Sequence, residues 1–203
     1  VKFGLNLSGS YTKGRVTGGL GGGRNIIGSS FLMDPQLKYQ NDDGTYPVSF
    51  SQPGMFANAN YYLVLRDRND NTSNMRGIVN AFSEIGIIDN LKYKISLNAD
   101  LSSDKNDAWV PSEANGGMFS APPNPAWGNY YNSNTTNWLI ENILTWNKTI
   151  ANDHNVDVLL GYTTQKSTTE WSRINASDYP DDEVYWFNAA TTKVGQGDRR
   201  QWA

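Results

Sequence analysis

The sequence predicts an all-β protein, and more narrowly part of a large antiparallel transmembrane β-barrel with long extracellular loops and short periplasmic turns. Apolar residues alternate with polar ones over several segments of about 12 to 15 residues, which is long beside a usual strand of about 5–6. Long and short connections also alternate along the chain. Because each antiparallel connection reverses the chain direction, all the long loops then fall on one side.

The composition excludes several classes of site. The chain has 203 residues, 17 Lys and Arg against 20 Asp and Glu, one His and no Cys. A net charge of −3 gives no reason to expect nucleic acid as a partner. The missing Cys excludes disulfides, thiolate metal sites and cysteine nucleophiles, and the lone His154 cannot supply a site that needs two imidazoles.

The alternation places the expected strands in order. They cover residues 1–12, about 74–88, 91–102, about 136–150, and a segment from 156 onward, which makes about five strands. Ile78 and Phe82 fall on the polar phase of the second strand, and Trp171 is out of phase with the last, which predicts a bulge or a strand end before it. Long loops are expected at 13–71, 103–134 and 172–199, and residues 201–203 are expected to begin a further strand. No segment shows a sustained helical period.

The clearest strand signal defines a candidate membrane-facing surface. Six alternate residues share the apolar phase, and in a barrel they would face lipid: Leu91, Tyr93, Ile95, Leu97, Ala99 and Leu101. The opposite phase would face a wet lumen. A soluble, glycan-binding β-sandwich alternates in the same way and is the alternative.

Several segments resemble, in order, the SusC/RagA family of TonB-dependent outer-membrane transporters of Bacteroidetes. The segment from Asn137 to Thr149 reads NWLIENILTWNKT and is similar to a barrel strand of that family, as is the following stretch from Val158 to Tyr162. Weaker likenesses are Asp34-Pro35 with Asp43 to Tyr46, Arg76 to Glu84 with Ile87 to Tyr93, and Tyr179 to Asp182 with Asn188 to Thr191. One departure is Asn60-Tyr61, where the family often has Asn-Pro.

The resemblance implies a function and partners. Residues 1–203 would be a partial barrel domain without a plug, in the outer membrane of a Gram-negative, Bacteroidetes-like cell, and the chain would import a nutrient. The resemblance further implies contact with outer-membrane lipid, a SusD-like lipoprotein as cap, energy from TonB through the absent plug region, and an oligosaccharide or peptide as substrate. A glycan is preferred, and neither enzymatic activity nor a cofactor is expected.

The candidate binding residues are aromatic side chains of the second expected loop. Aromatic faces stack on sugar rings, and neighbouring Asn side chains offer donors and acceptors to hydroxyls. The same residues suit packing against a partner lipoprotein: Trp109, Phe119, Trp127, Tyr130 and Tyr131. The paired loop acids, among them Asp43, Asp181 and Asp182, are interpreted as solvated surface groups rather than catalytic pairs. The stretch from Asp67 to Asp70 lacks the Gly and Glu of a calcium loop.

Overall fold

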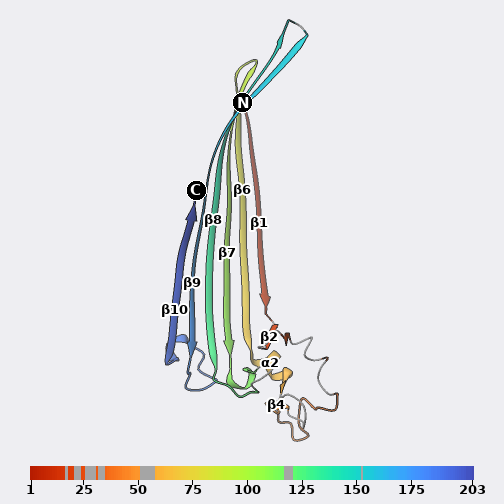
Figure 1. The fold of residues 1–203 in the computed structure, drawn as a ribbon. Helices are drawn as coiled ribbons and strands as arrows, with labels where there is room; N and C mark the ends of the chain where they lie inside the picture. The colour runs from red at the N-terminus through yellow and green to blue at the C-terminus, as the bar shows by residue number, and fades with distance from the viewer. Residues whose placement is uncertain are drawn as a thin grey trace.

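The computed structural model describes residues 1–16, 18–20, 24–25, 31, 35–50, 58–116, 121–151 and 153–203. One antiparallel sheet of six strands dominates it, with the strand order β1-β6-β7-β8-β9-β10. These strands are β1 (Lys2–Arg15), β6 (Asn69–Ile88), β7 (Leu91–Val110), β8 (Trp127–Ile150), β9 (His154–Ser177) and β10 (Thr192–Trp202). They lie side by side as one long wall whose edges are β1 and β10 (Figure 1).

The predicted strands are confirmed, and the structure extends most of them. The expectation of about five strands is wrong, because residues 192–202 already form β10. The second and third expected loops shorten to 111–126 and 178–191, since β7, β8 and β9 continue well past their apolar segments. No register shift interrupts the pairing of β8 with β9, so the bulge or strand end expected before Trp171 is absent.

The connections divide between the two ends of the wall as predicted. The turn at Asp89-Asn90 and the connection between β8 and β9 lie at one end, called here the turn end (Figure 1). The three long connections lie at the other, called the loop end. The β8–β9 hairpin projects farthest at the turn end, since Trp146 pairs with Leu91 and the hairpin continues to Ile150 opposite His154.

The register sorts the side chains onto two faces. Residues directly opposite each other on neighbouring strands share a face. The outer face carries the odd-numbered residues of β7, which confirms that Leu91 to Leu101 in the apolar phase share one surface. A typical row across this face is Leu5, Ala81, Leu97 and Ile140. The inner face carries the even-numbered residues of β7.

The two residues out of phase in β6 lie on the inner face. Phe82 is opposite Gly4, where an added Cβ would come within 2.0 Å of the phenyl ring. The Lys94 ammonium lies 4.9 Å from the centre of the same ring. Gly4 therefore gives Phe82 the room to lie flat on the inner face, beneath a cation that its ring attracts.

The loop end contains a small core of its own, built on a helix that the sequence analysis did not predict. Helix α2 (Tyr61–Asp67) begins after Asn60, whose side chain accepts a hydrogen bond from Tyr62 N and caps the helix. The Tyr61 that replaces the proline of the Asn-Pro pair noted in the sequence analysis is compatible with this helix. Proline favours the first helical position, and Tyr61 occupies that position while Asn60 still caps the helix. Leu63 and Val64 are each 1% exposed. None of the helices in the described residues is long and apolar enough to cross a membrane.

Short elements complete the loop end. Two small ribbons pair β2 (Gly18–Leu20) with β3 (Arg24–Asn25), and β4 (Ser49–Phe50) with β5 (Asn58–Ala59). The 3₁₀ turns η1 (Ser112–Ala114) and η2 (Phe187–Ala189) lie in the second and third loops. Buried Ala114 joins Tyr61 and Val64 in one cluster, so the first and second loops share a core.

Candidate functional site: the inner face and the loop end

A ladder of amide side chains crosses the inner face. Asn6 donates to Asn80 at 3.1 Å, and Asn80 donates to Asn98 at 2.5 Å. Asn98 in turn donates to the Glu141 carboxylate at 3.2 Å. The register of β1, β6 and β7 places Asn6, Asn80 and Asn98 in one row, and Glu141 of β8 lies one inner-face position nearer the turn end, opposite Ser96. An apolar membrane face cannot carry such a row, so the inner face is built for contact with water or polar ligands.

Charged groups flank this ladder on both sides. Toward the loop end, Arg76 makes a bidentate ion pair with Asp100, at 3.0 and 2.7 Å. Toward the turn end, the Lys2 ammonium lies 3.8 Å from the Glu84 carboxylate. These opposite charges balance within the face, which leaves a polar surface without a strong excess of either sign.

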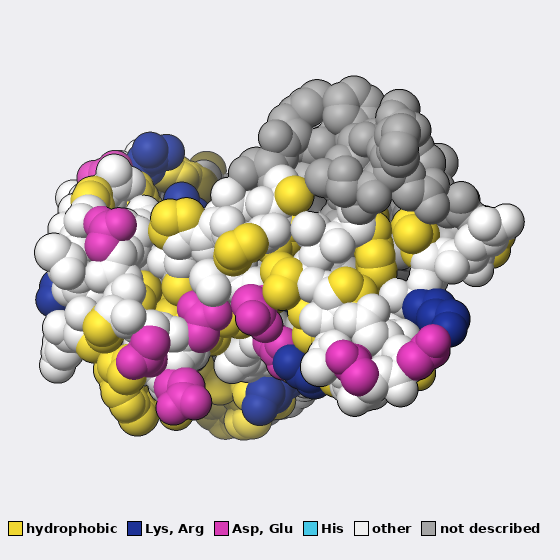
Figure 2. Space-filling view, turned by 90° about the horizontal axis from the view of Figure 1, so that it is seen from below, with side chains coloured by type: hydrophobic (Ala, Val, Ile, Leu, Met, Phe, Trp, Pro, Cys, Tyr) yellow, Lys and Arg dark blue, Asp and Glu magenta, His cyan; other side chains and the backbone are white. Residues whose placement is uncertain are grey.

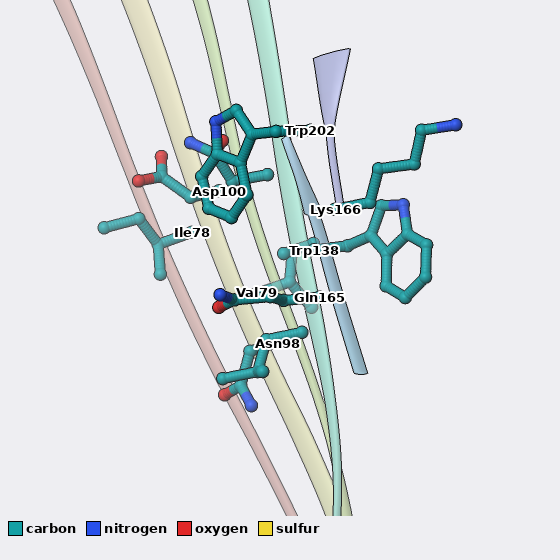
Figure 3. Close-up of a pocket in the computed structure, with 11 residues that line it drawn as sticks. Ile78, Val79, Asn98, Asp100, Trp138, Gln165, Lys166 and Trp202 are labelled. Atoms are coloured by element: carbon teal, nitrogen blue, oxygen red, sulfur yellow. The ribbon is translucent and has the colours of Figure 1, made fainter. Parts of the chain in front are cut away.

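A cavity of about 310 Å³ opens on the inner face beside the Arg76–Asp100 pair. Trp202, at the end of β10, lines it together with Ile78 and Asp100. Figure 3 shows the Trp202 indole directed over Asp100, while Trp138 and Lys166 point the other way, as the register requires. The amides of Asn98, Asn137 and Gln165 complete the polar lining. An exposed indole beside amides and a carboxylate can stack on a flat ligand surface and hydrogen-bond its edge.

A second aromatic group lies on the inner face nearer the loop end. The Tyr131 ring is 6.3 Å from the Trp171 ring, and the Arg173 guanidinium lies 5.1 Å from the Tyr131 ring centre. Tyr131 was expected from the sequence, whereas Trp171 and Arg173 were missed. The signal was present: Trp171 breaks the apolar phase of its strand because it faces inward.

The predicted aromatic residues do not form one loop cluster. Trp109 lies in β7, and Trp127, Tyr130 and Tyr131 lie in β8, so their assignment to a loop is wrong. Trp109 and Tyr130 share the outer face, whereas Trp127 and Tyr131 share the inner face. Phe119 lies outside the described residues. The alternation of apolar and polar residues did not identify these parts of the strands, because polar residues occupy both faces of the strands at this end.

Trp109 instead joins aromatic residues of the third loop. Its ring meets Tyr179 edge to face at 4.5 Å and lies 6.4 Å from Tyr185, which stacks on Trp186 at 4.8 Å. Gly128, opposite Trp109, makes room for the loop, because an added Cβ would lie 2.8 Å from the Tyr179 hydroxyl. Burial raises the pKa of this Tyr179 hydroxyl. Tyr185 and Trp186 stay exposed, and Figure 2 shows hydrophobic and acidic side chains interspersed over this end.

A third aromatic group lies in the first loop. Tyr46 stacks on Tyr62 at 4.9 Å between ring centres, Tyr39 lies 5.4 Å from Tyr62, and the Arg66 guanidinium lies 5.2 Å from the Tyr46 ring. The hydrogen bond with the Tyr62 hydroxyl is the main cause that raises the pKa of Tyr46. The loop end therefore presents exposed aromatic rings on two separate loops.

The paired loop acids hold the loops in shape. Asp43 accepts hydrogen bonds from Thr45 N and Oγ1, which lower the pKa of its carboxyl. Asp182 accepts bonds from Ser112 N and Oγ at 2.6 to 2.9 Å and so ties the third loop to the second. Asp182 is thus more than a solvated group. Across the described part of the chain, no cluster of three metal-binding side chains occurs.

Comparison with known proteins agrees with this architecture. No family model matches the chain. It is 30% identical over 193 residues to TonB-dependent receptor P3 of Formosa agariphila, an alignment that covers 92% of this chain and 18% of that protein. The RagAB peptide importer in its open-open state shares the fold with a TM-score of 0.68 at 15% identity, over 98% of this chain and 22% of that one. The RagAB peptide transporter gives 0.65 at 16% identity, with 98% and 23% covered.

An unclosed antiparallel wall with an apolar outer face and a polar inner face is a segment of a large β-barrel. The chain is similar, in sequence to a TonB-dependent receptor and in fold to the RagAB importers, to part of the barrel of TonB-dependent transporters of the SusC/RagA type. It spans about a fifth of the length of these relatives.

Proposed function

We propose that the chain forms part of the wall of an outer-membrane nutrient importer, with its inner face along the route of the substrate. The observation that carries this proposal is the hydrogen-bonded ladder from Asn6 to Glu141 on the inner face, set behind an outer face that is apolar at the same level. In this arrangement the wall separates lipid from a polar lumen. No covalent chemistry is assigned to it.

The single main sheet argues against the β-sandwich alternative. A sandwich needs two large sheets packed face to face at about 10 Å. In the described residues the other two sheets are two-stranded ribbons within the first loop. Large apolar side chains such as Leu160, 68% exposed, also remain uncovered on the outer face. In a barrel wall, membrane lipid would cover these side chains.

The partners follow from this placement. We propose that the loop end faces the outside of the cell, where a SusD-like lipoprotein caps the barrel, and that TonB acts through a plug region outside this part of the barrel. Exposed Tyr185 and Trp186 are suited to such a cap, since aromatic residues are enriched at protein interfaces.

We propose an oligosaccharide as the substrate and a peptide as the second candidate. The inner-face aromatics Trp202, Tyr131 and Trp171 lie beside amide and carboxylate groups, a combination that suits stacking on sugar rings and hydrogen bonding to hydroxyls. The peptide candidate rests on the solved RagAB importers, which share the fold and are described as peptide importers.

Uptake by cells that carry the full-length transporter tests both proposals. Trp202→Ala should reduce uptake of fluorescent oligosaccharides at an unchanged level of protein in the outer membrane. Trp146→Ala is the matched control, because Trp146 is a tryptophan of the outer face that does not line this cavity. Uptake of labelled peptides with no uptake of oligosaccharides would establish the second candidate. Uptake of neither in the wild type would contradict import.

A further inference from the structure

The outer face has a groove of about 630 Å³ at the edge of its apolar band that is nearer the loop end. Strands β1, β6, β7 and β8 lie next to one another there. Eight of the residues that line it share the outer face, among them Gly9, Tyr11, Met75, Gly77, Leu101 and Thr136. This groove is on the opposite face from the Trp202 cavity. The proposed transport route does not use it.

Missing side chains make the groove. Gly9 and Gly77 lie opposite each other and continue the row of Leu101 and Thr136. A Cβ added to Gly77 would meet nothing within 4 Å, and one added to Gly9 would meet only the Arg76 carbonyl oxygen at 4.0 Å. The groove is therefore open space rather than a site of backbone contact. Tyr11 and Met75, 67% and 60% exposed, provide apolar walls beside it.

Positive charge borders the groove on its loop-end side. Lys13 and Lys105 lie on the outer face in one row, with Ser73 between them. This row is the next outer-face row after that of Tyr11 and Met75, on the side of the loop end. Both lysines are exposed, and neither makes an ion pair within the described residues. In the next row Asp107 is accompanied by Arg15, which donates to the Leu65 carbonyl. Cations thus outnumber acids just beyond the groove.

We propose that this groove holds an acyl chain of one anionic membrane lipid, whose headgroup phosphate is bound by Lys13 and Lys105. An apolar channel that ends at two unpaired ammonium groups matches the two halves of such a lipid. A lysine binds phosphate as a point charge, so two of them on either side of Ser73 can share one phosphate without a fixed geometry. The proposal rests on the membrane placement of the wall under the proposed function.

Binding of lipid to the purified full-length transporter in mild detergent tests the apolar half. Native mass spectrometry would count retained molecules of phosphatidylglycerol across a titration. Gly77→Leu puts a side chain into the groove at a position where its Cβ would meet nothing within 4 Å. It should weaken this binding about tenfold, the loss expected for about 1.4 kcal/mol. Gly195→Leu is the matched control, since Gly195 also has open space around its Cβ position and lies in β10, outside the groove. Equal binding by Gly77→Leu and the wild type would overturn the proposal.

The charged half has its own test. In the double variant K13Q/K105Q, the affinity for phosphatidylglycerol should fall to that for zwitterionic phosphatidylcholine, whereas Lys166→Gln, elsewhere on the outer face, should keep the preference. Displacement of the lipid by millimolar inorganic phosphate would indicate a free-phosphate site and overturn the lipid assignment. Substrate uptake is measured in parallel: lost uptake with retained lipid would count against the import function alone, and lost lipid with normal uptake would support a separate site.

Discussion

The Tyr93 hydroxyl donates a 2.6 Å hydrogen bond to Asn142 Oδ1, and both side chains belong to the outer face. Asn142 lies between Ile140 and Leu144 on its own strand and opposite Ile95 on the next. It is a polar group in the middle of an apolar band. In lipid, an amide without a partner is costly, and the Tyr93 hydroxyl supplies the partner within the wall itself.

Tyr93→Phe should therefore destabilise the folded barrel by about 1–2 kcal/mol, since it leaves the Asn142 carbonyl without its donor. The free energy of unfolding of the full-length protein in bilayers would measure the loss. Tyr11→Phe is the control, because Tyr11 is an exposed tyrosine of the same face. Combining Tyr93→Phe with Asn142→Leu should restore stability, and a double variant no more stable than Tyr93→Phe alone would contradict this account.

The two faces should respond oppositely to charge. Leu97→Arg places a guanidinium on the outer face near the middle of the apolar band, at a cost of about 2–4 kcal/mol. Thr163→Arg places the same group one row away on the inner face, where Thr163 is exposed. Leu97→Arg should reduce the amount of assembled barrel in outer-membrane fractions, and Thr163→Arg should not. Equal tolerance of the two variants would argue against lipid on the outer face.

The Asp182 carboxylate should govern how firmly the second and third loops hold together. Asp182→Ala removes three hydrogen bonds to Ser112 and leaves the Ser112 backbone N–H without that acceptor. Limited proteolysis of membrane-embedded protein should then cut residues 178–191 faster, at an unchanged yield of barrel. Asp181→Ala is the comparison, because among the described residues the Asp181 carboxylate accepts hydrogen bonds only within its own turn, from Glu183 N and Val184 N. Equal rates of proteolysis in the two variants would show that Asp182 does not hold the two loops together.

The sequence predicted the strands where membrane and lumen impose opposite polarity on alternate residues. From Leu91 to Leu101 every second residue is apolar or small, and the register places all of them on one face. Beyond this band the contrast ends: Asp104, Lys105, Asn106 and Asp107 continue β7 with polar groups on both faces. Periodicity detects only a difference between faces, so this part of the strand was assigned to a loop.

Other features depend on register or length rather than on local pattern. The meeting of Tyr131 with Trp171 and Arg173 requires the pairing of β8 with β9, which residue spacing in one strand does not encode. Helix α2 has seven residues, too few to display a helical period, and its strongest local sign is the Asn60 cap. Trp202 was expected at the start of a strand and instead ends one, which brings its indole onto the inner face beside Asp100.

The orientation of the wall can be tested by cysteine labelling, since these 203 residues contain no native Cys. Strand parity places the three long connections at one end, and the turn at Asp89-Asn90 and the β8–β9 connection at the other. If the loop end is extracellular, single Cys residues at Glu113 and Glu183 should react with a membrane-impermeant maleimide on intact cells. Both side chains are exposed and make no hydrogen bond within the described residues, so the changes should leave the loops intact. A Cys at Asn90 should react only after the outer membrane is permeabilised.

A partner that caps the loops would slow the reactions at Glu113→Cys and Glu183→Cys, and deletion of its gene should restore them. Reaction at Asn90 on intact cells, with Glu113→Cys and Glu183→Cys protected even without the partner, would reverse the topology and move the exposed Tyr185 and Trp186 away from the substrate side.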